Sequence, residues 1–247
     1  MSAKPVRLFA ISAVLALALA GAAYGQDFQK SYQLAAGSSI RISNVSGDVT
    51  VTGYDGATIN VTGIKEGGNT EDVQIQDRST GSAIDIGVHY APGCQNCGGV
   101  TFQIQVPRSV NYDFERLHSV SGDVNVTGVT GRVEAQTVSG TVKVMDVAGM
   151  VNAKSVSGDV QVEMNRLEGT DDMSFSTVSG DVSVTAPASL DAKVEMSSFS
   201  GSLETSFPLQ IEKDKFTSRQ RATGQLGSGS RHVHISTVSG SVSLKQL

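Results

Sequence analysis

Apolar and polar positions repeat every eighteen residues from Ser119 onward. Two successive units are SVSGDVNVTGVTGRVEAQ (119–136) and TVSGTVKVMDVAGMVNAK (137–154). Related units follow as SVSGDVQVEMNRLEGTDDMSFS (155–176), TVSGDVSVTAPASLDAKVEMS (177–197), SFSGSL (198–203) and TVSGSVSL (237–244). A unit of this length cannot bury its apolar side alone, so copies must stack on one another. The pattern predicts a repeat protein.

Each unit divides into halves of nine residues, marked by glycine at positions 122, 131, 140, 149 and 158. Three apolar columns keep the same step. They are Val120, Val129, Val138, Val147, Val156; then Val124, Val133, Val142, Val151, Val160; and then Val126, Ala135, Val144, Ala153, Val162. Large and small residues alternate in the third column, so eighteen residues are the full period and nine are half a turn.

Short stretches such as Val124-x-Val126 alternate with the period of a half-buried strand. A glycine before each stretch is typical of a corner, and the predicted corners of this kind are Gly47, Gly122, Gly140, Gly158, Gly180, Gly201 and Gly240. Frequent valine and glycine both disfavour helix. We therefore predict an all-β, single-chain parallel β-solenoid (β-helix) with about 18 residues and two strands per rung. Valine would face alanine across its narrow interior.

The first 25 residues have the features of a secretory signal peptide. Lys4 and Arg7 precede an apolar run over 8–20, and Ala23 and Gly25 occupy the cleavage positions before Gln26. An uncleaved membrane anchor is the alternative, but the run is short for a span. No transmembrane segment is expected in the mature chain. We expect an exported protein that is periplasmic or extracellular, including the cell surface.

Composition narrows the choice of partners. The formal net charge is −5 and becomes −7 without Lys4 and Arg7, the chain has no tryptophan, and no basic cluster is present. Nucleic acid is therefore not an expected partner.

Departures from the nine-residue repeat indicate how the single solenoid domain, residues 26–247, is organised. Residues 26–117 keep strand-like alternation with longer turns and are expected to form irregular rungs or an end cap. Residues 118–203 hold the regular repeats. Residues 204–236 carry most of the local charge and are expected to project as an inserted loop, which is where repeat proteins often make contacts. Residues 237–247 would form the last rung, with an edge that little covers.

Cys94 and Cys97 are the only cysteines in the chain. In an exported, glycine-rich loop this single pair favours a small structural disulfide, while a redox or metal role is the alternative. His232 and His234 lie two apart and would share one face of a strand, but two ligands are few for a metal. We expect no metal and no cofactor.

Serine and aspartate recur beside the corner glycine. The serines (46, 121, 139, 157, 179, 200 and 239) could form a hydroxyl ladder for a ligand, but serine before glycine is also an ordinary turn residue. The aspartates (48, 123, 159 and 181) invite a calcium hypothesis, but repeats that bind calcium carry denser Gly-Asp motifs, so solvated corner carboxylates are favoured. A further acidic group, Glu163, Glu168, Asp171 and Asp172, lies in an irregular half-rung without a matching Arg, Lys or His group. No catalytic residues are assigned.

Several motifs together resemble a known family. They are the repeated TVSGDV and TVSGSV, the opening NVSGDVTVTGYDG, the central VTFQIQVPRSVNYDF and the final GSGSRHVHISTVSGSV. This combination, over about 38–247, is similar to a bacterial exported adhesin family of unknown function whose members are β-helical. The resemblance implies a β-solenoid at the cell envelope and no shared active site.

Three functional hypotheses follow. The first is a non-enzymatic exported β-solenoid that acts as a cell-envelope interaction or adhesion module and binds an envelope protein or a glycan. The second is an envelope-stress or regulatory component that binds a protein partner through 204–236. The third is a carbohydrate-active β-helix enzyme, which would need a carboxylate cluster along one face.

Overall fold

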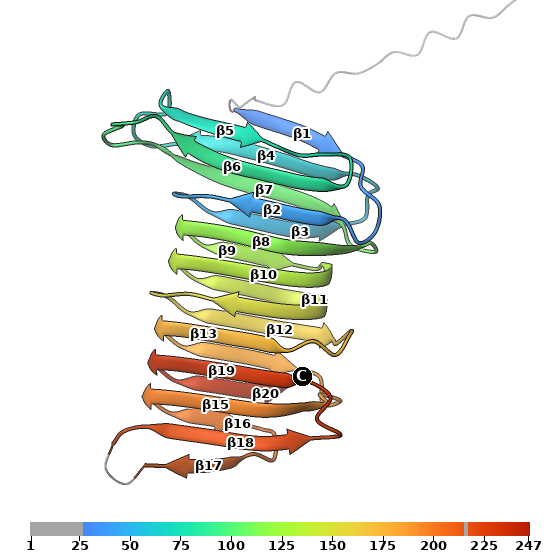
Figure 1. Ribbon diagram of the computed structural model, residues 1–247, viewed down its shortest axis with the longest axis vertical. Helices are drawn as coiled ribbons and strands as arrows, with labels where there is room; N and C mark the ends of the chain where they lie inside the picture. Colours follow the sequence, from blue (N-terminus) through green and yellow to red (C-terminus); the bar gives the residue numbers. More distant parts are fainter. Residues whose placement is uncertain (1–26, 215–216) are drawn as a thin grey trace, which may run out of the picture.

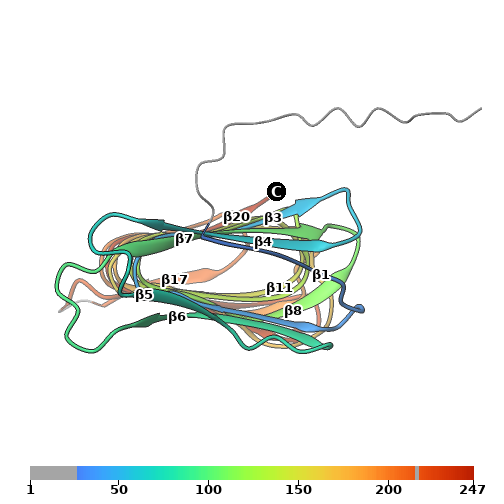
Figure 2. The ribbon, with the colours of Figure 1, turned by 90° about the horizontal axis from the view of Figure 1, so that it is seen from above.

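The computed structural model describes residues 27–214 and 217–247, so the predicted signal peptide lies outside the described residues. In these ranges all regular structure is β-strand. The strands form two layers that lie face to face in a long, flattened stack (Figures 1 and 2). We call the layers sheet A and sheet B. The long strand β11 (Val142–Lys154) runs from one to the other, so its start pairs in sheet B and its end pairs in sheet A.

Both sheets have parallel strands in their middle; sheet A has antiparallel pairs at both ends, whereas sheet B has them only at its N-terminal end and finishes with the parallel pair β20 and β16. Sheet A contains, in spatial order, β5 (Val73–Asp77), β6 (Ala83–Tyr90), β2 (Ser39–Ser43), β8 (Asn111–Ser121), β10 (Thr130–Ser139), the end of β11, β13 (Met173–Ser179), β19 (His232–Ser239), β15 (Ala192–Ser200), β18 (Gln220–Leu226) and β17 (Gln210–Lys213). Sheet B contains β1 (Phe28–Tyr32), β4 (Ile59–Glu66), β7 (Gly99–Pro107), β3 (Val49–Tyr54), β9 (Val124–Thr127), the start of β11, β12 (Val160–Arg166), β14 (Val182–Ala186), β20 (Val242–Gln246) and β16 (Leu203–Thr205).

The prediction of an all-β, solenoid-like fold is therefore confirmed, but the prediction of a uniform parallel coil is not. The eighteen-residue step holds in the middle, where Val142 pairs with Val124 on one side and Val160 on the other. The next step is longer, since Val160 pairs with Val182. Antiparallel pairs such as β4 with β7 and β15 with β18 make the sheets mixed.

The interior contains two of the three predicted apolar columns. All five valines of the second column and all five residues of the third are buried. Valines of the third column lie on sheet B, while Ala135 and Ala153 lie on sheet A, which explains the alternation of large and small residues. Larger residues, including Phe102, Phe114 and Tyr112, fill the N-terminal part of the stack.

The order of the rungs differs from the order of the chain at both ends. The rung formed by β2 and β3 lies between β6/β7 and β8/β9. The rung formed by β19 and β20 lies between β13/β14 and β15/β16. The expectation that residues 237–247 leave an uncovered edge was therefore wrong, because parallel strands flank this rung on both sides. We call these two arrangements the interleaved ends.

Separate elements cover the two ends of the stack. At the N-terminal end, the Lys30 ammonium on β1 bonds the Asp77 carboxylate on β5 at 2.5 Å, and the Tyr32 hydroxyl donates to the same carboxylate at 3.0 Å. At the C-terminal end, β17 and β18 extend sheet A as an antiparallel hairpin (Figure 1). Residues 204–236 are thus mostly strand, which corrects the expectation of a projecting loop. Their alternating pattern is weak because all four residues of β17 are exposed.

Candidate binding surface

The first residue of each TVSGD-type corner holds neighbouring rungs together. These side chains are buried, and each hydroxyl donates to a glycine carbonyl oxygen of the neighbouring rung at 2.8–3.0 Å. The pairs are Ser119 with Gly47, Thr137 with Gly122, Ser155 with Gly140, Thr177 with Gly158, Thr237 with Gly180 and Ser198 with Gly240. A buried carbonyl without such a donor would be costly. This column therefore supports the fold.

The predicted corner glycines allow the rungs to approach closely. At Gly140, φ is +149°, and a Cβ atom would lie 2.3 Å from the Gly122 carbonyl oxygen. All seven predicted corner glycines are confined in the same way, with the nearest backbone oxygen 1.9–2.4 Å from the Cβ position. Side-chain carbon atoms do not fit at such distances.

The corner aspartates also bind backbone, so the interpretation as solvated carboxylates was incomplete. Asp48 accepts from the Asp123 amide and Asp123 from the Thr141 amide, each at 2.8 Å. Asp159 and Asp181 accept from the next rung in the same way. No group of three His, Cys, Asp or Glu side chains in residues 27–214 and 217–247 is arranged to hold a metal ion.

The second residue of each corner is apolar and exposed, so the first apolar column divides between two environments. Val129 and Val147 are buried, but Val120, Val138 and Val156 point outward. With four equivalents they form a stack that we call the valine ridge, whose exposed fractions are 37–58%. In spatial order its members are Val45, Val120, Val138, Val156, Val178, Val238 and Phe199. The nine-residue repeat does not distinguish these positions, although the two corners of a rung have different environments.

The remaining residues singled out in the sequence do not converge on one site. The corner serines point outward beside the valine ridge, and their backbone carbonyls join the rungs, as between Ser139 and the Gly122 amide. Cys94 and Cys97 are joined by a disulfide in the turn between β6 and β7. His232 and His234 are exposed on sheet A.

Three of the four acidic residues considered for catalysis have partners, and two of those partners are arginines, which corrects the expectation that no basic group matches them. Asp171 lies 3.9 Å from the Arg132 guanidinium. Glu168 pairs with Arg166 at 2.6 Å, and the Asp172 carboxylate accepts from the His232 amide at 2.8 Å. These contacts hold an irregular turn and a strand end in place.

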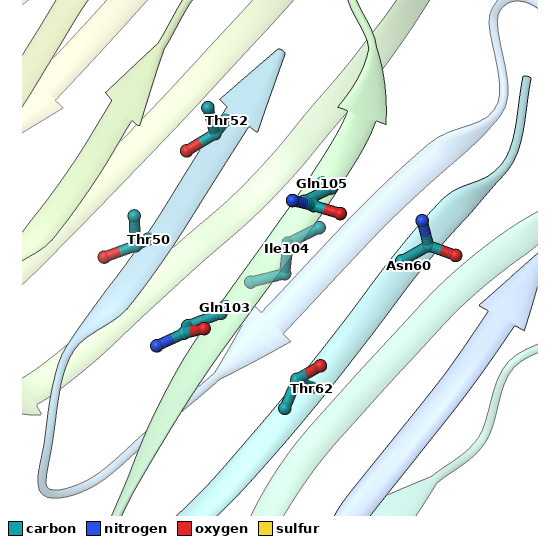
Figure 3. Close-up of a pocket in the computed structure, with 7 residues that line it drawn as sticks. All are labelled: Thr50, Thr52, Asn60, Thr62, Gln103, Ile104 and Gln105. Atoms are coloured by element: carbon teal, nitrogen blue, oxygen red, sulfur yellow. The ribbon is translucent and has the colours of Figure 1, made fainter. Parts of the chain in front are cut away.

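A shallow hollow lies on the outer side of sheet B, where β3, β7 and β4 are adjacent (Figure 3). It encloses about 260 Å³ and is lined by polar side chains that alternate with buried residues of the same strands. They are Thr50 and Thr52, Gln103 and Gln105, and Asn60 and Thr62, with Ile104 beneath them. None of these side chains carries a charge.

The amide of Asn60 is held in a defined orientation. Its oxygen accepts from the Ser31 hydroxyl at 2.8 Å, and its nitrogen donates to the Tyr54 hydroxyl at 3.2 Å. Tyr54 in turn donates to the Thr58 carbonyl oxygen at 2.6 Å. One wall of the hollow is therefore preorganised, which lowers the entropy lost when a ligand binds.

Sequence reasoning missed this hollow. Its residues come from three segments, TVT (50–52), NVT (60–62) and QIQ (103–105), each with uncharged polar residues around one apolar residue. That shared pattern was the available signal. Only the pairing of β4 and β3 on either side of β7 brings the segments together.

These features define a β-solenoid-like protein with an open polar surface. The family model that matches residues 30–245 is Toastrack DUF4097, and the chain belongs to this family. The expected resemblance to an adhesin family of unknown function is confirmed.

Solved structures with similar shape have low sequence identity. A "putative cell adhesion protein" from Clostridium sporogenes is 12% identical, with a TM-score of 0.46 over 89% of this chain and 99% of that chain. A "putative adhesin" from Bacteroides fragilis is also 12% identical, with a TM-score of 0.39 over 89% and 96% of the two chains. None of the curated proteins compared with the chain matches it. No helix in the described ranges is long and apolar enough to cross a membrane.

Proposed function

We propose that this protein is an exported, non-enzymatic interaction or adhesion module of the cell envelope, acting in the periplasm or at the cell surface. The observation that carries the proposal is the open, uncharged hollow on sheet B, whose side chains can donate and accept hydrogen bonds but include no acid, base or nucleophile activated by a neighbour. The family membership and the names given to the similar solved structures agree with such a role.

Two further features favour binding over catalysis. The repeated hydroxyls and carboxylates at the corners bind backbone, as Thr137 and Asp123 do, so their recurrence is explained by the scaffold. The acidic residues Glu168 and Asp172 are likewise held by local contacts. A rigid stack with an extended polar surface suits many weak contacts made at once.

Cosedimentation with isolated envelope material from the source bacterium tests this proposal. The mature protein should be retained in the pellet, and no reducing ends should be released from the polysaccharide fraction. If the protein stays in the supernatant, the interaction function fails. If reducing ends accumulate, the carbohydrate-active enzyme hypothesis replaces it.

The valine ridge favours a second candidate, a regulatory component of the envelope that binds a protein partner. Apolar residues recur at this exposed position in seven rungs, and contiguous exposed apolar patches often mark protein interfaces. Residues 204–236 are less suitable as the contact segment, because β17 and β18 cover the end of the stack.

Loss of binding in a ridge variant tests the second candidate. The double variant Val156→Asp, Val178→Asp should lose a protein partner captured from envelope extract, whereas Gln161→Asp on the outer side of sheet B should retain it. Equal capture by both variants would remove the ridge from consideration.

A further inference from the structure

We propose that the outer side of sheet B near the N-terminal end binds an uncharged polysaccharide. This inference rests on the proposed function and names its ligand class. The hollow in Figure 3 is the centre of a larger surface of ten outward side chains on five adjacent strands, which we call the neutral patch. Its members form two rows, Gln29, Thr62, Gln103, Thr50, Asn125 and Ser31, Asn60, Gln105, Thr52, Thr127.

The composition of the neutral patch is unusual for a protein surface. Its ten side chains are all amides or hydroxyls, whereas an exposed surface of this size ordinarily carries about three charges. The first row continues with Lys143 on β11 and Gln161 on β12, and the second row continues with Met145 on β11, so a charge appears on the first strand beyond the patch. The neutral character is therefore confined to the strands around the hollow.

The chemistry of the patch discriminates between classes of ligand. Nucleic acids, acidic glycans and lipid phosphates need cationic partners, and the ten positions offer none. A protein interface usually has an apolar core with aromatic, methionine or arginine anchors, and the patch lacks these residues. Hydroxyl groups of a neutral sugar both donate and accept hydrogen bonds, as amide and hydroxyl side chains do.

The geometry suits a chain rather than a single sugar. The rows cross five strands at about 4.8 Å per strand, so the patch extends over roughly 19 Å between its outer strands. Tyr54 follows Thr52 on β3 and places its hydroxyl against Asn60, so an aromatic ring borders the patch. Sugar rings have apolar faces that pack against aromatic side chains. Several weak contacts along one chain add up to useful retention.

Affinity electrophoresis provides the test, with hydroxyethylcellulose or galactomannan in the gel as neutral probes and alginate as the anionic probe. The mature protein should be retarded by at least one neutral probe and not by alginate. The double variant Gln103→Ala, Gln105→Ala should raise the dissociation constant for that probe at least tenfold. The matched control Gln161→Ala, the same change on the same side of sheet B outside the patch, should stay within twofold.

Three results would overturn the inference: no retardation by either neutral probe, equal retardation by alginate, or equal affinity of the patch variant and the control. Circular dichroism of both variants must match the parent, because all three glutamines are exposed. If the protein cosediments with envelope material but is not retarded by the neutral probes, the proposed function stands and the inferred ligand class is wrong. If it does neither, both proposals fail.

Discussion

The Thr137 hydroxyl donates to the carbonyl oxygen of Gly122 on the neighbouring rung at 2.9 Å, and both groups lie inside the corner of the stack. Equivalent bonds join other rungs. Serine and threonine both occur at this position because either side chain places a hydroxyl within hydrogen-bond distance of the glycine carbonyl oxygen. The neighbouring Val138 has the opposite environment, since its side chain is 41% exposed.

Replacing Thr137 with valine should destabilise the protein by about 1–3 kcal/mol, because the Gly122 carbonyl oxygen loses its donor while the side-chain volume is kept. The reverse exchange at the next residue, Val138→Thr, should change stability by less than about 0.5 kcal/mol. Urea denaturation of both variants measures the difference. Equal midpoints would show that the hydroxyl column does not stabilise the stack.

Gly140→Ala should be among the most damaging single substitutions in the chain. The added Cβ would lie 2.3 Å from the Gly122 carbonyl oxygen, and the φ of +149° is unfavourable for any residue with a side chain. We expect a loss above about 3 kcal/mol or failure to fold. Gly81→Ala is the control, because no heavy atom lies within 4 Å of its Cβ position. Comparable soluble yield and stability of the two variants would contradict the close stacking.

Val142 and Lys143 test the assignment of inner and outer positions. Val142 is fully buried on β11, whereas Lys143 is exposed. An aspartate at position 142 would bury a charge without a partner and lose a valine worth about 1.5–3 kcal/mol, so the unfolding midpoint should fall sharply. Lys143→Asp should stay within about 0.5 kcal/mol of the parent. Similar losses in chemical denaturation would refute the two-layer packing.

Asp77 should make the N-terminal end of the stack sensitive to acid. Burial alone would raise the pKa of Asp77, but hydrogen bonds from Lys30, Ser79 and Tyr32 outweigh it and hold this pKa well below its usual range. The folded chain therefore binds this proton less readily than the unfolded chain. The stabilisation is present above the unfolded pKa of about 4 and is lost as the pH falls below it.

Unfolding measured at pH 7 and pH 3 tests this linkage. Asp77→Asn should be less stable than the parent by about 1–3 kcal/mol at pH 7, and the difference should narrow at pH 3. Asp55→Asn serves as control, because it removes an exposed carboxylate that pairs with Arg108 on the surface. A gap between parent and Asp77→Asn that does not change with pH would exclude the proposed role of the carboxylate.

The fold class and most of the interior could be predicted because the relevant signals are local. Alternation of valine with polar residues identified strands such as Val142–Val144, and the nine-residue repeat placed Val133 and Ala135 in the interior between the two sheets. The valine ridge could not be recognised from the sequence, because Val138 and Val147 look alike in a nine-residue pattern. Only the structure shows that Val147 lies between the two sheets and that Val138 lies outside them.

The order of the rungs and the neutral patch could not be predicted, for a related reason. Units with nearly the same sequence can stack on one another in any order, so the local pattern does not say that β3 lies between β7 and β9. The patch depends on that order, since Thr50, Asn60 and Gln103 become neighbours only through it. Contacts distant in the sequence, and not the repeat itself, decide these features.

The interleaved ends limit how such a chain can lengthen by duplication. Between Asn111 and Ala186, rungs that follow one another along the chain are also adjacent in the stack. An extra eighteen-residue copy inserted there would lengthen the stack and leave the strand pairing at both ends unchanged. An extra copy beside β19 or β2 would have to insert between strands that are already paired. β19 lies between β13 and β15, and β2 lies between β6 and β8, although these neighbours are distant in the sequence. The most faithful copies of the unit, 119–136 and 137–154, occur within the permissive stretch.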